Sequence, residues 1–247
     1  MSRWKAASIH LSISAAIAIV ACALFFGVWY PGAYFHAAGA DELVILLVGV
    51  DLAIGPLLTL IVFRSGKKGL RFDLTTIGVV QAVALIYGCH VVLASRPIFL
   101  VAALDRFVLV SDNEISDADL SLASEPQFQT RSWTGPILVA AVLPADVEER
   151  NKLVFDAASG HDIQFQPKFY RPFANEAQSL LAHAKTLDAL QSKGGVATRM
   201  IGSYLQKSDN KADSVVWLPL QTRKTDAVML VDKFSGMPLK ALPIDPW

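Results

Sequence analysis

Three long apolar stretches in the first 96 residues constrain this chain more than any other feature. They run from about 6 to 29, 43 to 63 and 74 to 94, and each has the roughly 20 residues that an α-helix needs to cross a bilayer. The sequence therefore predicts a bundle of three transmembrane helices, which occupies residues 1–96.

The rest of the chain has a different composition. Apolar residues make up 53% of the 247 residues and the mean hydropathy is +0.42, but this excess lies almost entirely before residue 96. Residues 97–247 have an ordinary globular composition, with β-prone runs near both ends and helical spacing between them. We expect them to form one α+β domain. The formal net charge of +0 gives no indication of a nucleic-acid partner.

Several local patterns indicate the elements of this α+β domain. Val147 and Val154 belong to an apolar series with helical spacing, which predicts a helix there. The clearest helix is predicted from Asn175, a capping residue, to Gly194, which can end it. Two late β-prone runs follow, and a loop at 234–236 predicts a C-terminal hairpin.

Positively charged residues predict the direction of the spans. Before residue 96 they are Arg3, Lys5, Arg64, Lys67, Lys68 and Arg71. The connection at 31–42 has none and carries Asp41 and Glu42 instead. By the positive-inside rule, the N-terminus and the loop around Lys67 are cytoplasmic, and the α+β domain lies on the outer side.

The second span contains one acidic residue, Asp51, close to its middle. A carboxyl group there costs on the order of 3 kcal/mol unless it faces a polar partner, protein or water. Asp51, Gly55 and Thr59 follow one another at intervals of four residues and so share a helix face. Pro56 removes one helical hydrogen bond and is expected to kink the helix beside the carboxyl group.

Two partners for Asp51 stay open. One is Gln81, which we place on one face of the third span together with Gly78, Leu85 and Gly88. The other is a polar group on a transmembrane helix of a second protein. Small residues let helices approach closely in lipid, and either contact would use that property. The first span has a series of small residues as well, Ser8, Ser12, Ala15 and Cys22.

Patterns that would indicate catalysis or metal binding are missing from the sequence. The five histidines have no metal-ligand spacing, and there is no nucleophile elbow, P-loop or dinucleotide-binding motif. Asp51 lacks the second carboxyl group at mid-membrane depth that aspartyl-type chemistry requires. We therefore expect no enzyme activity, no cofactor and no metal.

Short motifs follow one another along the whole chain in a particular order. They are "MSRWKA", "FFGVWYPG", "GVDLAIGPLLTLIVF", "RSGKKGLRFDL", "SRPIFLVAALDRFVLV", "FYRPF" at 169–173 and the closing "LPIDPW". In order and spacing they resemble the type IV pilin accessory proteins of the TfpX/TfpZ type. The resemblance is closest over residues 1–110 and the last few residues.

This resemblance implies a multi-pass inner-membrane protein of Gram-negative bacteria with a periplasmic C-terminal domain. Such a protein binds the major type IV pilin, acts as a chaperone-like factor and promotes or modulates pilin stability and pilus assembly, and so twitching motility. The pilin has an apolar helix in the bilayer and a periplasmic head, so both the pilin and the lipid are partners. The expected pilin contacts are Asp51, Gly55, Pro56, Thr59 and Gln81 in the membrane, and Tyr170 and Arg171 as surface positions of the outer domain.

A second function class is a membrane-tethered sensor or regulator whose periplasmic domain binds a ligand. The predicted cytoplasmic part consists of a few N-terminal residues and one short basic loop. Because this is too small for an output domain, such a regulator would act through a separate cytoplasmic partner.

Overall fold

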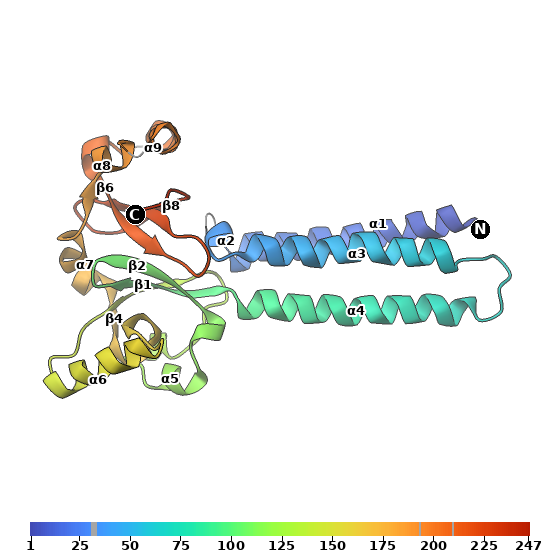
Figure 1. Ribbon diagram of the computed structural model, residues 1–247, viewed down its shortest axis with the longest axis horizontal. Helices are drawn as coiled ribbons and strands as arrows, with labels where there is room; N and C mark the ends of the chain where they lie inside the picture. Colours follow the sequence, from blue (N-terminus) through green and yellow to red (C-terminus); the bar gives the residue numbers. More distant parts are fainter. Residues whose placement is uncertain (31–33, 193, 209) are drawn as a thin grey trace. The chain divides into compact units, whose positions relative to one another are not determined.

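The computed structural model divides the chain into two compact units (Figure 1). The residues that it describes are 1–30, 34–192, 194–208 and 210–247. Met1–Trp29 and Ala40–Ser95 form the first unit, which we call the membrane unit. Tyr30–Gly39 and Arg96–Trp247 form the second, which we call the sheet domain.

The membrane unit consists of three long helices. They are α1 (Arg3–Leu24), extended by the π-helical turn η1 (Phe25–Trp29), then α3 (Ala40–Val62) and α4 (Leu70–Ala94). Each is long and apolar enough to cross a membrane, which confirms the three predicted spans. The helix α3 continues through Pro56, whose missing N–H leaves the Leu52 carbonyl without its helical donor.

The basic residues that predict the topology lie at one end of the membrane unit. Arg3 and Lys5 are in the first turns of α1, and the others are in or beside the α3–α4 loop, which Figure 1 shows at the same end as the N-terminus. All six are exposed. Lys67 forms an ion pair of 2.6 Å with Asp73, the first-turn acid of α4.

The sheet domain is built on one mixed β-sheet with the strand order β4-β3-β1-β2-β6-β7-β8, while β5 pairs with β6 beside this path. Its strands are β1 (Pro97–Ala103), β2 (Arg106–Ser111), β3 (Ile137–Ala141), β4 (Tyr170–Pro172), β5 (Lys185–Thr186), β6 (Val215–Gln221), β7 (Ala227–Asp232) and β8 (Pro238–Leu242). The pairs β1–β3 and β2–β6 are parallel and the others are antiparallel. This confirms an α+β domain after the three helices.

Helices cover both faces of this sheet. They are α2 (Tyr34–Ala37), α5 (Asp117–Ser121), α6 (Val147–Ala158), α7 (Phe173–Leu181), α8 (Leu187–Gln191) and α9 (Gly195–Lys207). The 3-10 turns are η2 (Asp112–Glu114), η3 (Pro126–Phe128), η4 (Ile163–Phe165), η5 (Pro167–Phe169) and η6 (Ala212–Ser214). Because both faces are covered, β1 is buried along its whole length and its sequence lacks a polar alternation.

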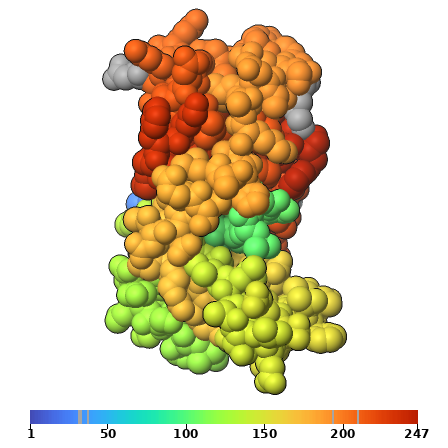
Figure 2. Space-filling view, turned by 90° about the vertical axis from the view of Figure 1, so that its left-hand side faces the viewer, coloured from blue at the N-terminus to red at the C-terminus, as the bar shows by residue number. Residues whose placement is uncertain are grey.

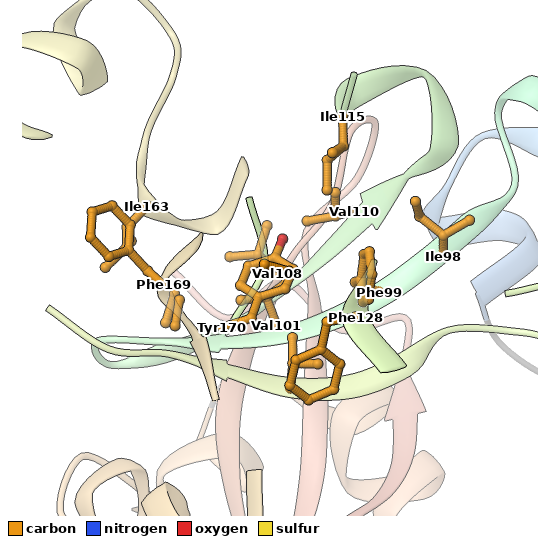
Figure 3. Close-up of a cluster of buried hydrophobic side chains, with 14 of the residues drawn as sticks. Ile98, Phe99, Val101, Val108, Val110, Ile115, Phe128, Ile163, Phe169 and Tyr170 are labelled. Carbon is orange, nitrogen blue, oxygen red and sulfur yellow. The ribbon is translucent and has the colours of Figure 1, made fainter. Parts of the chain in front are cut away.

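Three apolar clusters fill the space between sheet and helices. Alternate residues of β1 point to opposite faces, so Phe99 and Val101 join one cluster (Figure 3) while Leu100 joins a second, in which α7 packs. A third cluster holds α8 and α9 against Trp217 and Leu230, on the face of the sheet opposite to α7.

The predicted helix from Asn175 to Gly194 is wrong, because the chain changes faces of the sheet within it. The helix α7 begins before Asn175 and ends at Leu181, and β5 then pairs with β6. The indole N–H of Trp217 donates to the Thr186 carbonyl at 2.9 Å, which fixes this crossing. The next helix, α8, packs on the opposite face, and position 193 lies outside the described residues.

Two neighbouring expectations have mixed outcomes. The predicted C-terminal hairpin is confirmed as β7–β8, with Gly236 at a φ of +73° in its loop. The helix α6 is also present, but its apolar series faces outwards: Val147 is 61% exposed and Val154 is 68% exposed. Leu153 is the residue that α6 buries. Figure 2 shows this part of the chain, in yellow, at the surface of the sheet domain.

Pro219 lies where β6 changes its partner along one side. It lies inside a central strand, where a residue without an N–H cannot donate to the neighbouring strand. On that side β5 pairs with Val216 and Trp217, before the proline, and β2 pairs with Leu220 and Gln221, after it. The strands β5 and β2 therefore pair with β6 on either side of the proline.

The segment between the first two spans belongs to the sheet domain. Tyr34 and Ala38 pack against the second apolar cluster, and Tyr30 contacts Phe35 edge to face with ring centroids 5.8 Å apart. A side chain at Gly39 would meet the Lys224 side chain at 2.9 Å. Since this segment and the C-terminal residues share one folded unit, both lie on the same side of a membrane that the helices cross.

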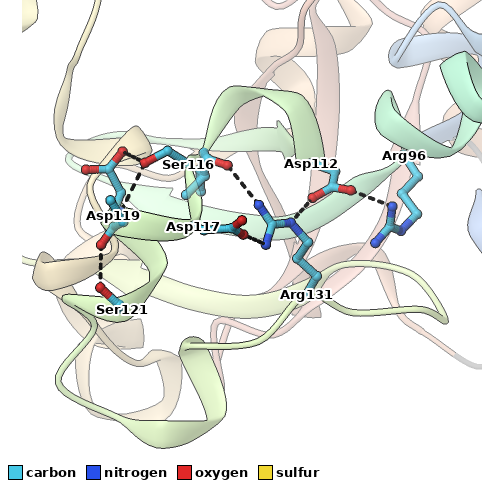
Figure 4. A network of polar contacts seen from close by, with 9 residues as sticks. Arg96, Asp112, Ser116, Asp117, Asp119, Ser121 and Arg131 are labelled. Atoms are coloured by element: carbon cyan, nitrogen blue, oxygen red, sulfur yellow. Dashed lines mark hydrogen bonds and ion pairs between the residues drawn. The ribbon is translucent and has the colours of Figure 1, made fainter.

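A buried ion-pair network stabilises the start of the sheet domain (Figure 4). Arg96, which is only 2% exposed, forms an ion pair of 2.6 Å with Asp112 and lies 4.9 Å from the centre of the Trp133 ring. Arg131 joins Asp112 to Asp117. Burying a guanidinium is tolerated because a carboxylate compensates its charge.

Asp112→Ala is expected to destabilise the sheet domain by about 3 kcal/mol, because it removes the carboxylate that forms an ion pair with the buried Arg96. Asp117→Ala is the matched control, since Asp117 is 88% exposed and its ion pair is worth less than about 1 kcal/mol. Pulse proteolysis of the full chain in detergent micelles, across a urea series, measures both. Equal losses in the two variants would contradict the assigned role of Arg96.

Tyr34 gives the packing of the segment a pH dependence. Burial raises its pKa to about 12, whereas an unfolded tyrosine has a pKa near 10. The contribution of the neutral phenol is therefore complete below about pH 10 and is lost as pH rises to about 12. Unfolding at about pH 9 and about pH 11 should show wild type losing more stability than Tyr34→Phe. Parallel pH curves for the two proteins would contradict this.

Candidate functional site: a groove between membrane helices

The helix α3 lies in the middle of the membrane unit. Both α1 and α4 pack along it, and within the described residues they hardly touch each other. The buried residues of α3 follow the predicted face and include Asp51, Gly55 and Thr59. Most of α4, by contrast, is uncovered, because only Val92 is buried. The three helices thus form an open arrangement in which α4 keeps a free side.

Gly55 allows the closest approach between α3 and α4. A Cβ atom at this position would lie 2.1 Å from Nε2 of Gln81, so a larger residue would displace that side chain from its present position. Gly88 has the equivalent role on α4, where a Cβ atom would lie 2.3 Å from a methyl carbon of Leu47. At both positions a glycine of one helix receives a side chain of the other, as small residues do in membrane helix pairs.

The expected contact between Asp51 and Gln81 is present in a different form. Nε2 of Gln81 donates to the backbone carbonyl of Asp51 at 3.3 Å. The carboxyl group of Asp51, which is only 9% exposed, interacts with the Gln81 side chain and electrostatically with His10. Oε1 of Gln81 is buried and has no hydrogen-bond partner among the described residues. Polar groups of α3 therefore have partners on both neighbouring helices, α1 and α4.

His10 is a site residue that the sequence reasoning missed. Its Nδ1 lies 2.6 Å from Oγ1 of Thr59, a hydrogen bond that joins α1 to α3. The positions of the two residues along their spans could have indicated this contact. Thr59 lies close to the end of the second span, and His10 lies at a similar distance from the start of the antiparallel first span, so both lie at a similar depth in the membrane. The series of small residues in α1 is covered only in part: Ala15 and Cys22 are partly covered and Ser8 and Ser12 are exposed, whereas Ser14 and Ala18 are buried.

The face chosen for α4 was partly wrong. Gln81, Leu85 and Gly88 lie on the side that is partly covered. Gly78 does not, since it is exposed and a Cβ atom there would meet nothing within 4 Å. Ile77, one position earlier, is partly covered in its place.

An apolar groove lies between α3 and α4, with Asp51 in its wall. Its volume is about 230 Å³. The lining residues are Leu43, Leu46, Leu47, Val50, Asp51, Ala84, Tyr87, Gly88 and Val91. Leu46 and Tyr87 are 67% and 69% exposed, so the groove opens to the surroundings of the helices. A group that packs in this groove would contact apolar side chains and one carboxyl group.

The predicted surface positions of the sheet domain do not both lie at the surface. Tyr170 is completely buried, stacks edge to face on Phe99 and donates its hydroxyl to the Gln164 carbonyl. Burial raises the pKa of Tyr170 well above its ordinary value. Its placement at the surface was wrong because β4 turns this side chain into the core. Arg171 is partly exposed and donates to the Lys168 and Tyr170 carbonyls.

Comparison with known proteins relates this arrangement to a family. The family model for the fimbrial assembly protein FimB matches residues 1–39. The fimbrial assembly protein of Dichelobacter nodosus serogroup I is 30% identical over 233 residues, which is 93% of this chain and 90% of that protein. The chain belongs to the fimbrial assembly protein family. The serogroup E1 protein of the same organism gives the same identity and coverage.

A third family member is similar over a shorter part of this chain. The Dichelobacter nodosus fimbrial assembly protein of serogroups C1 and C2 is 34% identical over 113 residues, which is 45% of this chain and 86% of that protein. The longer alignments, in contrast, include both the membrane unit and the sheet domain. No solved structure matches this fimbrial assembly family member.

Gly55→Ala is expected to destabilise the membrane unit by about 1–3 kcal/mol, because the added methyl group overpacks the contact with Gln81. Gly78→Ala is the matched control: it adds the same methyl group to an apolar helix, but at a position with nothing within 4 Å. Unfolding of the purified protein by increasing fractions of sodium dodecyl sulfate in mixed micelles measures the difference. Equal stability of the two variants would contradict the close approach at Gly55.

Proposed function

We propose that this protein is an accessory factor for type IV pilus assembly that binds the major pilin. It acts in the bacterial inner membrane as a chaperone-like factor without catalysis, and it promotes or modulates the stability of the pilin and its assembly into pili. The family membership supports a role in pilus assembly, since the relatives bear the name of fimbrial assembly proteins. The observation that carries the pilin contact is the apolar groove between α3 and α4.

A transmembrane helix suits this groove better than a small ligand does. The groove is open, and nearly all of its lining side chains are apolar. In lipid, the gain from filling such a groove comes from close packing and from interhelical hydrogen bonds, because the lipid is as apolar as the lining. The apolar helix of a pilin provides both when its side chains enter the groove and a polar group reaches Asp51.

The proposed topology is compatible with a pilin that has its helix in the bilayer and its head in the periplasm. The positively charged residues at the Lys67 end favour the cytoplasm. The segment Tyr30–Gly39 and the C-terminal residues share one folded unit, so the same assignment puts both in the periplasm. There the sheet domain can meet the pilin head, and Arg171 remains a proposed contact. Tyr170 is not proposed, because it has no exposed surface.

Photo-cross-linking tests the groove with a matched pair of positions. Leu46 lines the groove and is 67% exposed, whereas its neighbour Ile45 is 71% exposed and does not line it. A benzoylphenylalanine at position 46 is expected to cross-link the major pilin in cells, at a yield several-fold above that from position 45. Equal yields, or no pilin product from position 46 in a cell that still makes pili, would exclude the groove as the pilin site.

Substitution of Asp51 tests the proposed contact of its side chain with the pilin. The Gln81 side chain donates to the backbone carbonyl of residue 51, so Asp51→Leu keeps this hydrogen bond and loses the contact of the carboxyl group with Gln81, whereas Asp51→Asn keeps a polar group for both Gln81 and the pilin. We expect Asp51→Leu to accumulate normally in a deletion strain but to lose the cross-link from position 46, surface pilin and twitching, while Asp51→Asn keeps them. Normal surface pilin in the deletion strain itself would overturn the proposed function and favour a sensor or regulator.

A further inference from the structure

A second groove lies within the sheet domain, between α9 and the strand β8. Its volume is about 640 Å³. From α9 it receives Val196, Met200 and Tyr204, and from the other side residues 240–243. Val196 is 56% exposed, whereas its neighbour Ala197 is buried in the third apolar cluster. The groove is therefore larger than the one in the membrane unit and has an apolar floor.

The wall formed by residues 240–243 is the edge of the sheet. Successive residues of a strand point to opposite faces, so a groove lined by all four touches the backbone edge and not one face. The strand β8 is the last of the sheet, and no described strand pairs with its outer side. Its prolines, Pro238 and Pro243, lie at or beyond its two ends, so Leu239 to Leu242 all keep their N–H groups. An unpaired edge of this kind is a template for another strand.

The rim of the groove is positively charged. Arg199, Lys207 and Lys240 line it, all three are exposed, and none forms an ion pair with another described residue. The part of the sequence that surrounds the groove also has an excess of positive charge. Residues 185–247 have nine Lys and Arg against six Asp and Glu, whereas residues 97–184 have six against twelve. The groove thus attracts carboxylates.

We propose that this groove binds an extended, acidic peptide segment of another protein, which adds to β8 as a further strand. Main-chain hydrogen bonds to the alternate residues of Leu239–Leu242 that point away from β7 hold the segment, its apolar side chains pack on Val196 and Met200, and its carboxylates meet the three cations of the rim. An anionic lipid surface would use the cations but not the backbone edge. This proposal is independent of the pilin contact in the membrane unit.

The test uses the full chain in phosphatidylcholine nanodiscs and a short fluorescent peptide in which glutamate and valine alternate. We expect this peptide to bind, and to protect from hydrogen exchange those amides of residues 239–242 that point away from β7. Lys240→Glu and Arg199→Glu should each weaken binding by about tenfold or more, since each places a like charge against the peptide. Lys211→Glu is the matched control, because Lys211 is an exposed cation outside the groove.

Two further probes separate strand addition from simple charge attraction. A peptide of the same sequence with N-methyl groups at alternate residues cannot pair with β8 and should lose binding. A peptide with lysine in place of glutamate should not bind. No binding of the first peptide, unchanged binding after N-methylation, or protection of residues 239–242 by phosphatidylglycerol in the nanodisc without any peptide would each overturn the proposal.

Discussion

The central position of α3 depends on one constraint, namely that a polar group within the membrane needs a partner in the protein. α3 carries an acidic residue, a threonine and a proline that removes a backbone donor, and each leaves a polar group to be satisfied. His10 reaches Thr59 from one side, and Gln81 reaches the Asp51 carbonyl from the other. Two neighbours on two sides place α3 between them and leave α1 and α4 apart. The open groove beside α4 is a consequence of this arrangement.

Much of the membrane unit could be predicted from the sequence, because the physical rule behind it is simple. The length of an apolar stretch decides whether it can span a bilayer, and a spacing of four residues placed Asp51, Gly55 and Thr59 on one buried face. The faces of α1 and α4 were harder to predict. Nearly every face of an apolar helix has the same composition, so the sequence does not show whether Gly78 or Ile77 faces α3. Only the packing against α3 decides between them.

In the sheet domain the sequence predicted the α+β class and several helices and strands. The spacing of apolar residues gave a wrong helix where two elements pack on opposite faces of the sheet. Ala177 and Leu180 belong to one cluster, and Leu187 and Leu190 belong to another across the sheet. Their spacing suits a single helix, yet one helix cannot pack against both faces, so β5 interrupts it. For the same reason Tyr170 was misplaced, since its burial depends on pairing with β3, a contact between residues far apart in the sequence.

The segment between the first two spans connects the two units in a way that matters for how the protein can be divided. The chain enters the sheet domain at Tyr30, leaves it at Gly39 and returns at Arg96. Cutting the chain after Arg96 would therefore separate Tyr34 and Phe35 from the core in which they pack, and would expose apolar surface on both pieces. The family model that matches residues 1–39 ends with this same segment. The sheet domain therefore needs, for its complete core, a piece of the chain that lies between two of the long apolar helices.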